Sequence, residues 1–193
     1  MTMRIIRTAT HEQWNAHGYQ LRSIEHLCHN NSAAIWLDKT AVVLTAFQEL
    51  QDQGIAKKML VIAPSRVCQL VWRQEALKWS HLRDMRFAQM AGEDAKTRKA
   101  LLRTEADVWL INPESVKWLC DHYGSPIGRW PFDTLTIDES TKFKNSQAER
   151  SKALQPMANK TMRRWELTGT PSPNGYKDLF GQMKLIDGGA ALG

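Results

Sequence analysis

Short, wholly apolar runs alternate along this chain with longer segments in which apolar residues recur every three or four positions. The apolar runs are 33–37, 59–63, 108–111, 135–137 and 165–167, and a further short strand is expected around 86–90. The segments expected as helices are 19–29, 38–54, a segment from Ser65, 94–103, 113–124 and 176–186. Strands that are apolar throughout must be covered on both faces, so the pattern predicts a parallel sheet between two layers of helices.

Capping residues mark the ends of two of these helices. Asp38 is expected to cap one helix at its start, and Gly54 suits the C-terminal end of the same helix. Ser65 is expected to cap the next helix. The apolar positions of that helix are Val67, Leu70, Val71, Leu77 and Trp79.

Polar groups follow the apolar runs one after another. They are Asp38-Lys39-Thr40, Pro64-Ser65-Arg66, Asn112-Pro113, Asp138-Glu139 and Thr168-Gly169-Thr170. The carboxyl ends of parallel strands meet at one edge of a sheet, so we expect these groups to gather there. Ligands of open α/β sheets bind at this edge, which makes it the expected functional site.

The pair Asp138-Glu139 suits phosphoryl transfer. The first carboxylate can hold Mg²⁺, directly or through water, and the second can orient or deprotonate an attacking water. Two acidic residues after a strand are weak evidence alone, because a strand-end aspartate often only caps a loop. The pair therefore takes its meaning from the motifs around it.

The composition is that of an ordinary globular protein. The chain has 193 residues, of which 42% are hydrophobic and 24% charged, and this length suits one domain. No apolar run approaches the roughly 20 residues of a membrane helix, and no secretory signal is recognisable. The scattered cysteines Cys28, Cys68 and Cys120 favour buried thiols in a reducing compartment. We therefore expect a cytoplasmic protein with no membrane partner.

The net charge of +6 is unevenly spread. Residues 140–193 contain nine Lys and Arg and four acidic residues, a net charge of +5, so the first 139 residues carry only +1. A basic region in one part of a domain favours a polyanion as partner. A solvated surface rich in Lys and Arg fits the same numbers, so charge alone does not decide.

The order of the motifs is more informative than any one of them. In chain order they are Gln20, Lys39-Thr40, "VIAPSRV" (61–67), "LINPESV" (110–116), "IDES" (137–140), "FKNSQAERSKAL" (143–154) and "LTGTPSPNG" (167–175). This series resembles the first motor lobe of superfamily 2 helicases and translocases, especially the Swi/Snf-type DNA translocases, including short forms in bacteriophages. The resemblance runs from about Gly18 to Gly193. It implies a bacterial or phage-infected cell as the setting.

The resemblance implies a role for each matching residue. Tyr19 and Gln20 match the region that reads adenine, Lys39 the phosphate-binding lysine, and Thr40 the hydroxyl that binds Mg²⁺. Asp138 and Glu139 match the catalytic pair, with Asp138 as a second Mg²⁺ ligand. Thr168, Gly169 and Thr170 match the motif that couples nucleotide state to DNA. The residues that would track a DNA strand are Ser65, Arg66, Asn112, Lys144, Asn145 and Ser151. ATP, Mg²⁺ and double-stranded DNA, bound without sequence preference, are the implied ligands.

Two features depart from the family. Its phosphate loop, Gly-x-x-x-x-Gly-Lys-Ser/Thr, works because glycine conformations let successive N–H groups wrap a phosphate. Here about four residues are missing before Lys39, and no glycine lies between Gly18 and Gly54. As a helix cap, Asp38 would also place a carboxylate where the phosphate should lie. Second, the family's catalytic arginine comes from a second lobe, which this sequence does not reach, and contributes about 10³–10⁵ in rate.

We therefore expect a three-layer, RecA-like α/β domain at 18–193, preceded by an N-terminal extension at 1–17. We expect a motor lobe of an ATP-dependent DNA helicase or translocase that binds ATP poorly and does not hydrolyse it alone. Three interpretations stay open. The chain is an enzyme completed by a separate second lobe, a non-catalytic DNA-binding or regulatory module, or a decoy that occupies the partner of a helicase.

Overall fold

A parallel sheet of six strands lies at the centre of the computed structural model, which describes residues 13–35, 39–124, 129–138 and 148–167. The strands are β1 (Ser32–Ile35), β2 (Met59–Ile62), β3 (Phe87–Gln89), β4 (Val108–Ile111), β5 (Thr134–Asp138) and β6 (Arg163–Leu167). Their order across the sheet is β1-β6-β5-β2-β4-β3. Each strand overlaps a segment in which the sequence predicts a strand, and β5 lies centrally, as expected.

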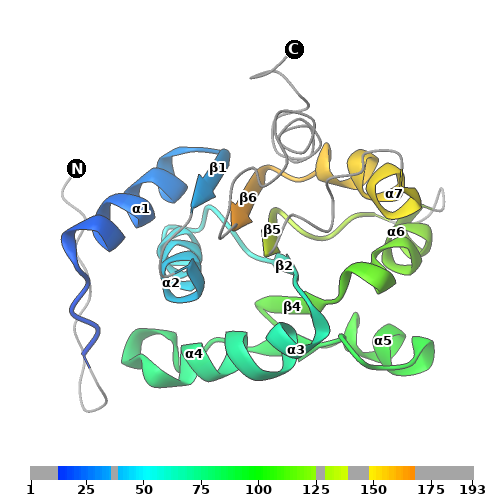
Figure 1. Cartoon of the computed structure of the whole chain (residues 1–193), viewed down its shortest axis with the longest axis horizontal. Coiled ribbons are helices and arrows are strands. Elements are labelled where there is room, and N and C mark those ends of the chain that lie inside the picture. Colours follow the sequence, from blue (N-terminus) through cyan, green and yellow to red (C-terminus); the bar gives the residue numbers. More distant parts are fainter. Residues whose placement is uncertain (1–12, 36–38, 125–128, 139–147, 168–193) are drawn as a thin grey trace.

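Helices cover both faces of this sheet (Figure 1). On one face lie α1 (Gly18–His29), α2 (Lys39–Asp52) and the helical run Ser65–Lys78; on the other lie α5 (Ala95–Leu101), α6 (Val116–Gly124) and α7 (Glu149–Ala158). Strand β2 shows the division, because Met59 and Val61 join the core under α2, whereas Leu60 and Ile62 join the core under α6 and α7. The predicted three-layer α/β architecture is confirmed.

The helical run Ser65–Lys78 is not one regular helix. It consists of α3 (Ser65–Val67), a π-helical turn η1 (Cys68–Trp72) and α4 (Arg73–Lys78), and a short 3₁₀ turn η2 (Ser80–Leu82) follows it. The residue in the N-cap position is Pro64, and no side chain caps the helix. The prediction that Ser65 is the cap is therefore wrong by one residue, because Ser65 is already helical.

The π turn also changes which face of the run is buried. The buried side chains are Cys68, Trp72 and Ala76, whereas Leu70 and Leu77 are 57% and 52% exposed. Of the five apolar positions predicted to form one helical face, Val67 and Trp79 pack partly buried against the core, whereas Leu70, Val71 and Leu77 are exposed, so the prediction is only partly right. A π turn inserts an extra residue into the helix, and a pattern with a fixed helical period cannot anticipate it.

Two helical segments differ in how well the sequence predicts them. Helix α2 ends at Asp52, and Gly54 adopts a left-handed φ of 70°, as its expected place at the helix end requires. Helix α7 was not predicted as a helix, because its sequence is largely polar and Pro156 lies inside it. The helix expected at 176–186 lies outside the described residues. None of the helices in the described part of the chain has the length and apolar character needed to cross a bilayer.

The three cysteines are free, as the sequence favoured. Cys68 and Cys120 are buried, and burial raises the pKa of each thiol to about 12. Cys28 is half-buried; burial, followed by the charge of Glu49, raises its pKa to about 11. Thiolates are therefore scarce at neutral pH.

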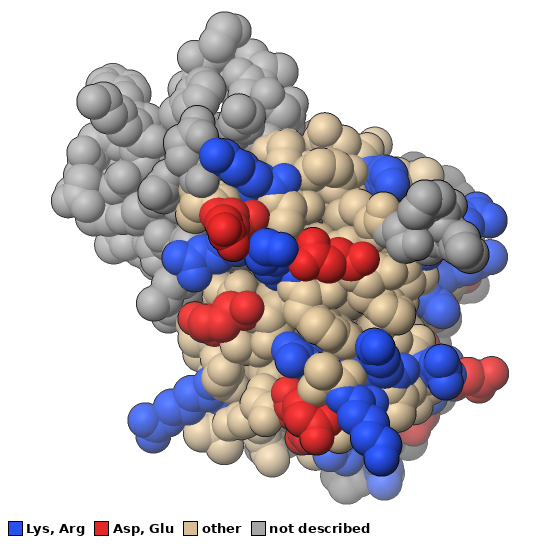
Figure 2. All heavy atoms as spheres, turned by 90° about the vertical axis from the view of Figure 1, so that its right-hand side faces the viewer, with Lys and Arg blue, Asp and Glu red and all other residues tan. Residues whose placement is uncertain are grey.

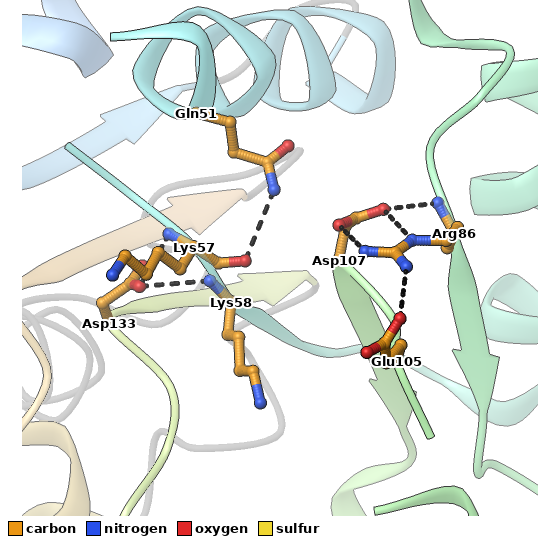
Figure 3. Close-up of polar contacts among 7 residues, drawn as sticks. All are labelled: Gln51, Lys57, Lys58, Arg86, Glu105, Asp107 and Asp133. Carbon is orange, nitrogen blue, oxygen red and sulfur yellow. Dashed lines mark hydrogen bonds and ion pairs between the residues drawn. The ribbon is translucent and has the colours of Figure 1, made fainter. Parts of the chain in front are cut away.

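At the amino-terminal edge of the sheet, two aspartates tie neighbouring strand starts together (Figure 3). Asp133 Oδ2 accepts hydrogen bonds from the backbone N–H groups of Lys57 and Lys58 at 2.8 and 3.1 Å. Asp107 Oδ2 accepts from the backbone N–H of Arg86 at 2.8 Å, and its Oδ1 accepts from Arg86 Nη2 at 3.1 Å. These contacts fix the strand starts at the edge opposite the expected site.

Candidate functional site

The register of the sheet brings the carboxyl ends of β2, β4 and β5 level. Ile62, the last residue of β2, pairs with Ile111 of β4 and with Ile137 of β5. The next residue after Ile111 is Asn112, and the next after Ile137 is Asp138. Two expected site residues therefore stand at one edge, on either side of the connection that leads from β2 into α3.

A cleft of about 750 Å³ opens at the start of α2. Its walls include Gln20, Lys39 and Thr40, three of the four residues expected to bind nucleotide. Gln20 is 6% exposed, and its Oε1 accepts a hydrogen bond of 2.8 Å from the backbone N–H of His17. Tyr19 is 37% exposed and stacks on His17, with ring centroids 5.7 Å apart, and it is not among the lining residues.

The cleft has an aromatic and acidic wall that the sequence did not reveal. Trp14 stacks on His81, with ring centroids 5.3 Å apart, and lies 6.0 Å from Trp79. Burial lowers the pKa of His81, which favours its neutral form, and its Nε2 is 2.8 Å from Thr45 Oγ1. A single tryptophan before the first helix carries no signal of such packing.

Glu75 closes the same wall from α4. Its Oε1 accepts a hydrogen bond of 3.0 Å from Trp79 Nε1, and its Oε2 lies 2.6 Å from Lys78 Nζ. The carboxylate is thus already engaged by Lys78, on its own helix, and by Trp79, the residue that directly follows that helix. Lys39, at the first position of the 14-residue helix α2, brings positive charge to the cleft where the helix dipole also favours an anion.

Of the two expected magnesium ligands, Thr40 lines the cleft, whereas Asp138, at the end of β5, is not among its lining residues. The Thr40 hydroxyl and the Asp138 carboxylate are hard oxygen donors of the kind that Mg²⁺ prefers. A phosphate loop needs six residues between the strand and its lysine. Strand β1 ends at Ile35 and α2 begins at Lys39, so only residues 36–38 connect them, and none is glycine. These three residues, with the expected Asp38 cap, lie outside the described residues.

The residues expected to track DNA have different environments. Arg66 is exposed, and Ser65 and Asn112 are half-buried. Asn112 Nδ2 donates to Glu114 Oε2 at 2.8 Å, while its buried Oδ1 has no hydrogen-bond partner in the described part of the chain. Ser151 is only 4% exposed, so its hydroxyl does not reach a DNA phosphate in this arrangement.

Six expected site residues cannot be placed. Glu139, Lys144, Asn145, Thr168, Gly169 and Thr170 lie outside the described residues. The structure does place the residues that come before two of these segments. Asp138, which directly precedes Glu139, pairs with Leu167, which directly precedes Thr168.

Charge alone does not mark the site. Arg163, one of the basic residues after position 139, is 6% exposed within β6 and so adds nothing to a surface patch. The side of the molecule that carries α5, α6 and α7 shows Lys and Arg interspersed with Asp and Glu (Figure 2). Lys117 and Asp121 of α6, for example, form an ion pair of 2.9 Å. On this side of the molecule the Lys and Arg residues therefore belong to a solvated surface of mixed charge.

The chain belongs to the SNF2-related domain family, whose pattern matches residues 13–190. Protein p41 of Acyrthosiphon pisum secondary endosymbiont phage 1 is 41% identical over 185 residues, covering 91% of this chain and 40% of that protein. The ATP-dependent helicase fft1 of Schizosaccharomyces pombe is 28% identical over 151 residues, covering 78% of this chain and 16% of that protein. The chain thus spans less than half the length of these relatives.

Solved structures give the same fold. The Sulfolobus solfataricus SWI2/SNF2 ATPase core in complex with dsDNA matches with a TM-score of 0.73 and 22% identity, covering 91% of this chain and 36% of that one. The UvsW helicase from bacteriophage T4 matches with a TM-score of 0.65 and 11% identity, covering 88% and 57%. The described part of the chain therefore has the RecA-like α/β fold of these structures.

Proposed function

We propose that this chain is a motor lobe that binds double-stranded DNA at the carboxyl edge of its sheet and binds ATP only weakly. The observation that supports DNA binding is that β2 and β4 end level with each other at this edge. Asn112 directly follows β4, and Ser65 and Arg66 follow β2 by a few residues. A relative of the same fold was solved with dsDNA. By resemblance, Lys144 and Asn145 complete the proposed face, and the buried Ser151 is not part of it.

The proposed contacts are to phosphates and not to bases. Arg66 supplies an exposed guanidinium, and Ser65 stands at a helix start, where N–H groups and hydroxyls suit phosphate oxygens. Such contacts position a protein on DNA without reading its sequence. With about three or four contacts, the affinity should lie within, or be weaker than, the range of dissociation constants of about 10⁻⁴–10⁻⁶ M that is typical of non-specific binding.

The proposed defect in ATP binding lies on the phosphate side of the cleft. Gln20, Lys39 and Thr40 are brought together, but a connection of three residues leaves no room for the loop that wraps a phosphate. If nucleotide binds, Thr40 and Asp138 would hold the Mg²⁺, which neutralises phosphate charge, and Glu139 would orient water. Family members also use an arginine from a second lobe, so we expect no turnover by the 193-residue chain alone.

The proposed domain covers 18–193, with 1–17 as an extension. Trp14 belongs to that extension, yet its ring packs on His81 and Trp79 and lines the cleft. The described part of the extension, residues 13–17, is therefore proposed to form part of the nucleotide side and to be needed for its shape.

DNA binding is tested by anisotropy with two unrelated duplexes at several salt concentrations. Each neutralised phosphate should contribute about −0.9 to the slope of log K against log salt. Arg66→Ala and Lys144→Ala should weaken binding to both duplexes alike and flatten the slope by up to about one unit. Lys57→Ala is the matched control, because it removes an exposed charge at the opposite edge of the sheet (Figure 3).

Two results would contradict the proposal. One is no binding to either duplex at low salt, and the other is an Arg66→Ala variant that behaves like Lys57→Ala. Either result would leave a protein partner as the better explanation of the basic residues. Pull-down against motor proteins would then test the decoy, and an ATPase assay with and without duplex DNA separates an enzyme completed by a partner from a non-catalytic module.

A further inference from the structure

A buried indole contacts the carboxylate that the family resemblance assigns to magnesium. Trp72 Nε1 donates a hydrogen bond of 3.3 Å to Asp138 Oδ2. Trp72 is 0% exposed, whereas Asp138 is half-buried at the end of β5. A buried indole N–H needs a polar partner, and here that partner is an acidic side chain of the candidate site.

The π turn brings Trp72 to this place. Cys68, at the start of the turn, donates from its Sγ to the backbone oxygens of Ala63 and Ile111 at 3.3 and 3.6 Å. Trp72, at the end of the turn, reaches Asp138. One turn therefore contacts the ends of β2, β4 and β5, and π turns of this kind are frequent at functional sites.

The helical run that contains Trp72 also touches the other parts of the site. Arg66, near its start, is exposed and belongs to the proposed DNA face, and Glu75, near its end, lines the cleft that contains Lys39. Trp72 lies between them and faces inward. The indole is thus held by an element whose two ends are both placed at the candidate site.

We propose that Trp72 is a positioning residue that fixes the Asp138 carboxylate in one rotamer at the carboxyl edge. Hydrogen bonds to a metal-binding carboxylate orient it for its ion, and a rigid indole packed in the core suits this task. This role rests on the proposed function, in which Asp138 is a magnesium ligand. Both partners of the hydrogen bond belong to this chain, so it can be tested separately, in experiments that need neither nucleotide nor DNA.

The first test uses the indole N–H signals in a ¹H–¹⁵N NMR spectrum of the full chain. Trp72→Phe identifies the Trp72 signal by its loss. Asp138→Asn should then shift that signal, because a charged acceptor is replaced by a neutral amide. The Trp109 signal is the internal control, because that indole donates to the Leu101 carbonyl oxygen at 3.2 Å. A Trp72 signal that moves no more than the Trp109 signal would overturn the proposal.

The second test measures positioning directly through the three-bond couplings of Asp138. We expect a single rotamer in the unmodified chain and rotamer averaging in Trp72→Phe. Trp109→Phe is the matched control, since Trp109 is 1% exposed and also loses a buried N–H hydrogen bond. Unchanged couplings in Trp72→Phe, or equal averaging in both variants, would overturn the proposal.

These tests stay decisive in two unfavourable cases. If Trp72→Phe does not fold, the Trp72 signal is assigned by sequential NMR methods and the Asp138→Asn shift decides alone. If the chain binds neither DNA nor ATP, both measurements are unaffected, because neither ligand is present. Failure of the proposed function and failure of this inference are therefore distinguishable.

Discussion

At the scale of single residues, Asp107 shows how charge stabilises the sheet away from the site. Its side chain is 17% exposed and holds the backbone and guanidinium of Arg86. Burial raises the pKa of Asp107, but the hydrogen bonds and the charge of Arg86 outweigh that effect, so the net pKa is lower than usual. The ionised form is therefore favoured by folding.

Asp107→Ala should lower the free energy of unfolding by about 1–2 kcal/mol at neutral pH, because it leaves the Arg86 donors without their charged acceptor. A pKa depressed in the folded state gives stability that is complete above the unfolded value of about 3.9 and is lost as pH falls through the folded value. Urea unfolding of the unmodified chain and of Asp107→Ala, at about pH 7 and about pH 3, should show that the difference between their free energies of unfolding is smaller in acid. An equal difference at both pH values would contradict this.

Sequence motifs located some site residues and missed others for a physical reason. Asn112 and Asp138 directly follow apolar runs of the sequence, so their place at the carboxyl edge follows from the parallel sheet. Trp72 has no such marker, because an apolar pattern treats every tryptophan as core and does not show where its N–H points. Trp14 was missed in the same way, since its partners are distant in sequence.

At the scale of elements, the burial pattern of the helical run 65–78 predicts which of its leucines stabilise the fold. Leu70→Ala and Leu77→Ala should change the free energy of unfolding by no more than about 0.5 kcal/mol, because both side chains are more than half exposed. Leu82→Ala, just beyond the run, is the matched control: Leu82 is 0% exposed, and its truncation should cost about 2–5 kcal/mol. Urea unfolding measures all three. A loss of unfolding free energy for Leu77→Ala as large as that for Leu82→Ala would contradict this burial pattern and would favour the uniform helix predicted from the sequence.

The elements that the sequence predicted well are those whose burial is uniform along their length. Strands β2 and β4 are buried at every position, and each matches an apolar run. Helix α7 buries only part of a polar segment and contains Pro156, so its pattern is weak. The π turn depends on packing against three strand ends, which no local pattern reports.

At the scale of the whole molecule, the fold and the family are shown. Which ligands the chain binds depends on the short segments that follow the strands at the carboxyl edge of the sheet. The same sheet order and layers place a cleft at the start of α2 and a level edge beside it. The uneven charge of the sequence does not locate the DNA face, because Arg163 is buried and the side in Figure 2 is mixed in sign. The DNA proposal therefore rests on residue placement and not on net charge.

The central proposal is that this motor lobe binds the triphosphate only weakly, because the sequence has just three residues, none of them glycine, between the end of β1 and Lys39, where the family's phosphate loop needs six. Titration of a fluorescent ATP analogue with Mg²⁺ tests it, for the chain as it is and for a version with a Gly-rich tetrapeptide inserted between Asp38 and Lys39. We predict no micromolar binding by the unmodified chain, and binding without multiple turnover once the insertion supplies the missing N–H groups. A micromolar, Mg²⁺-dependent Kd for the unmodified chain that Lys39→Ala abolishes would contradict the account.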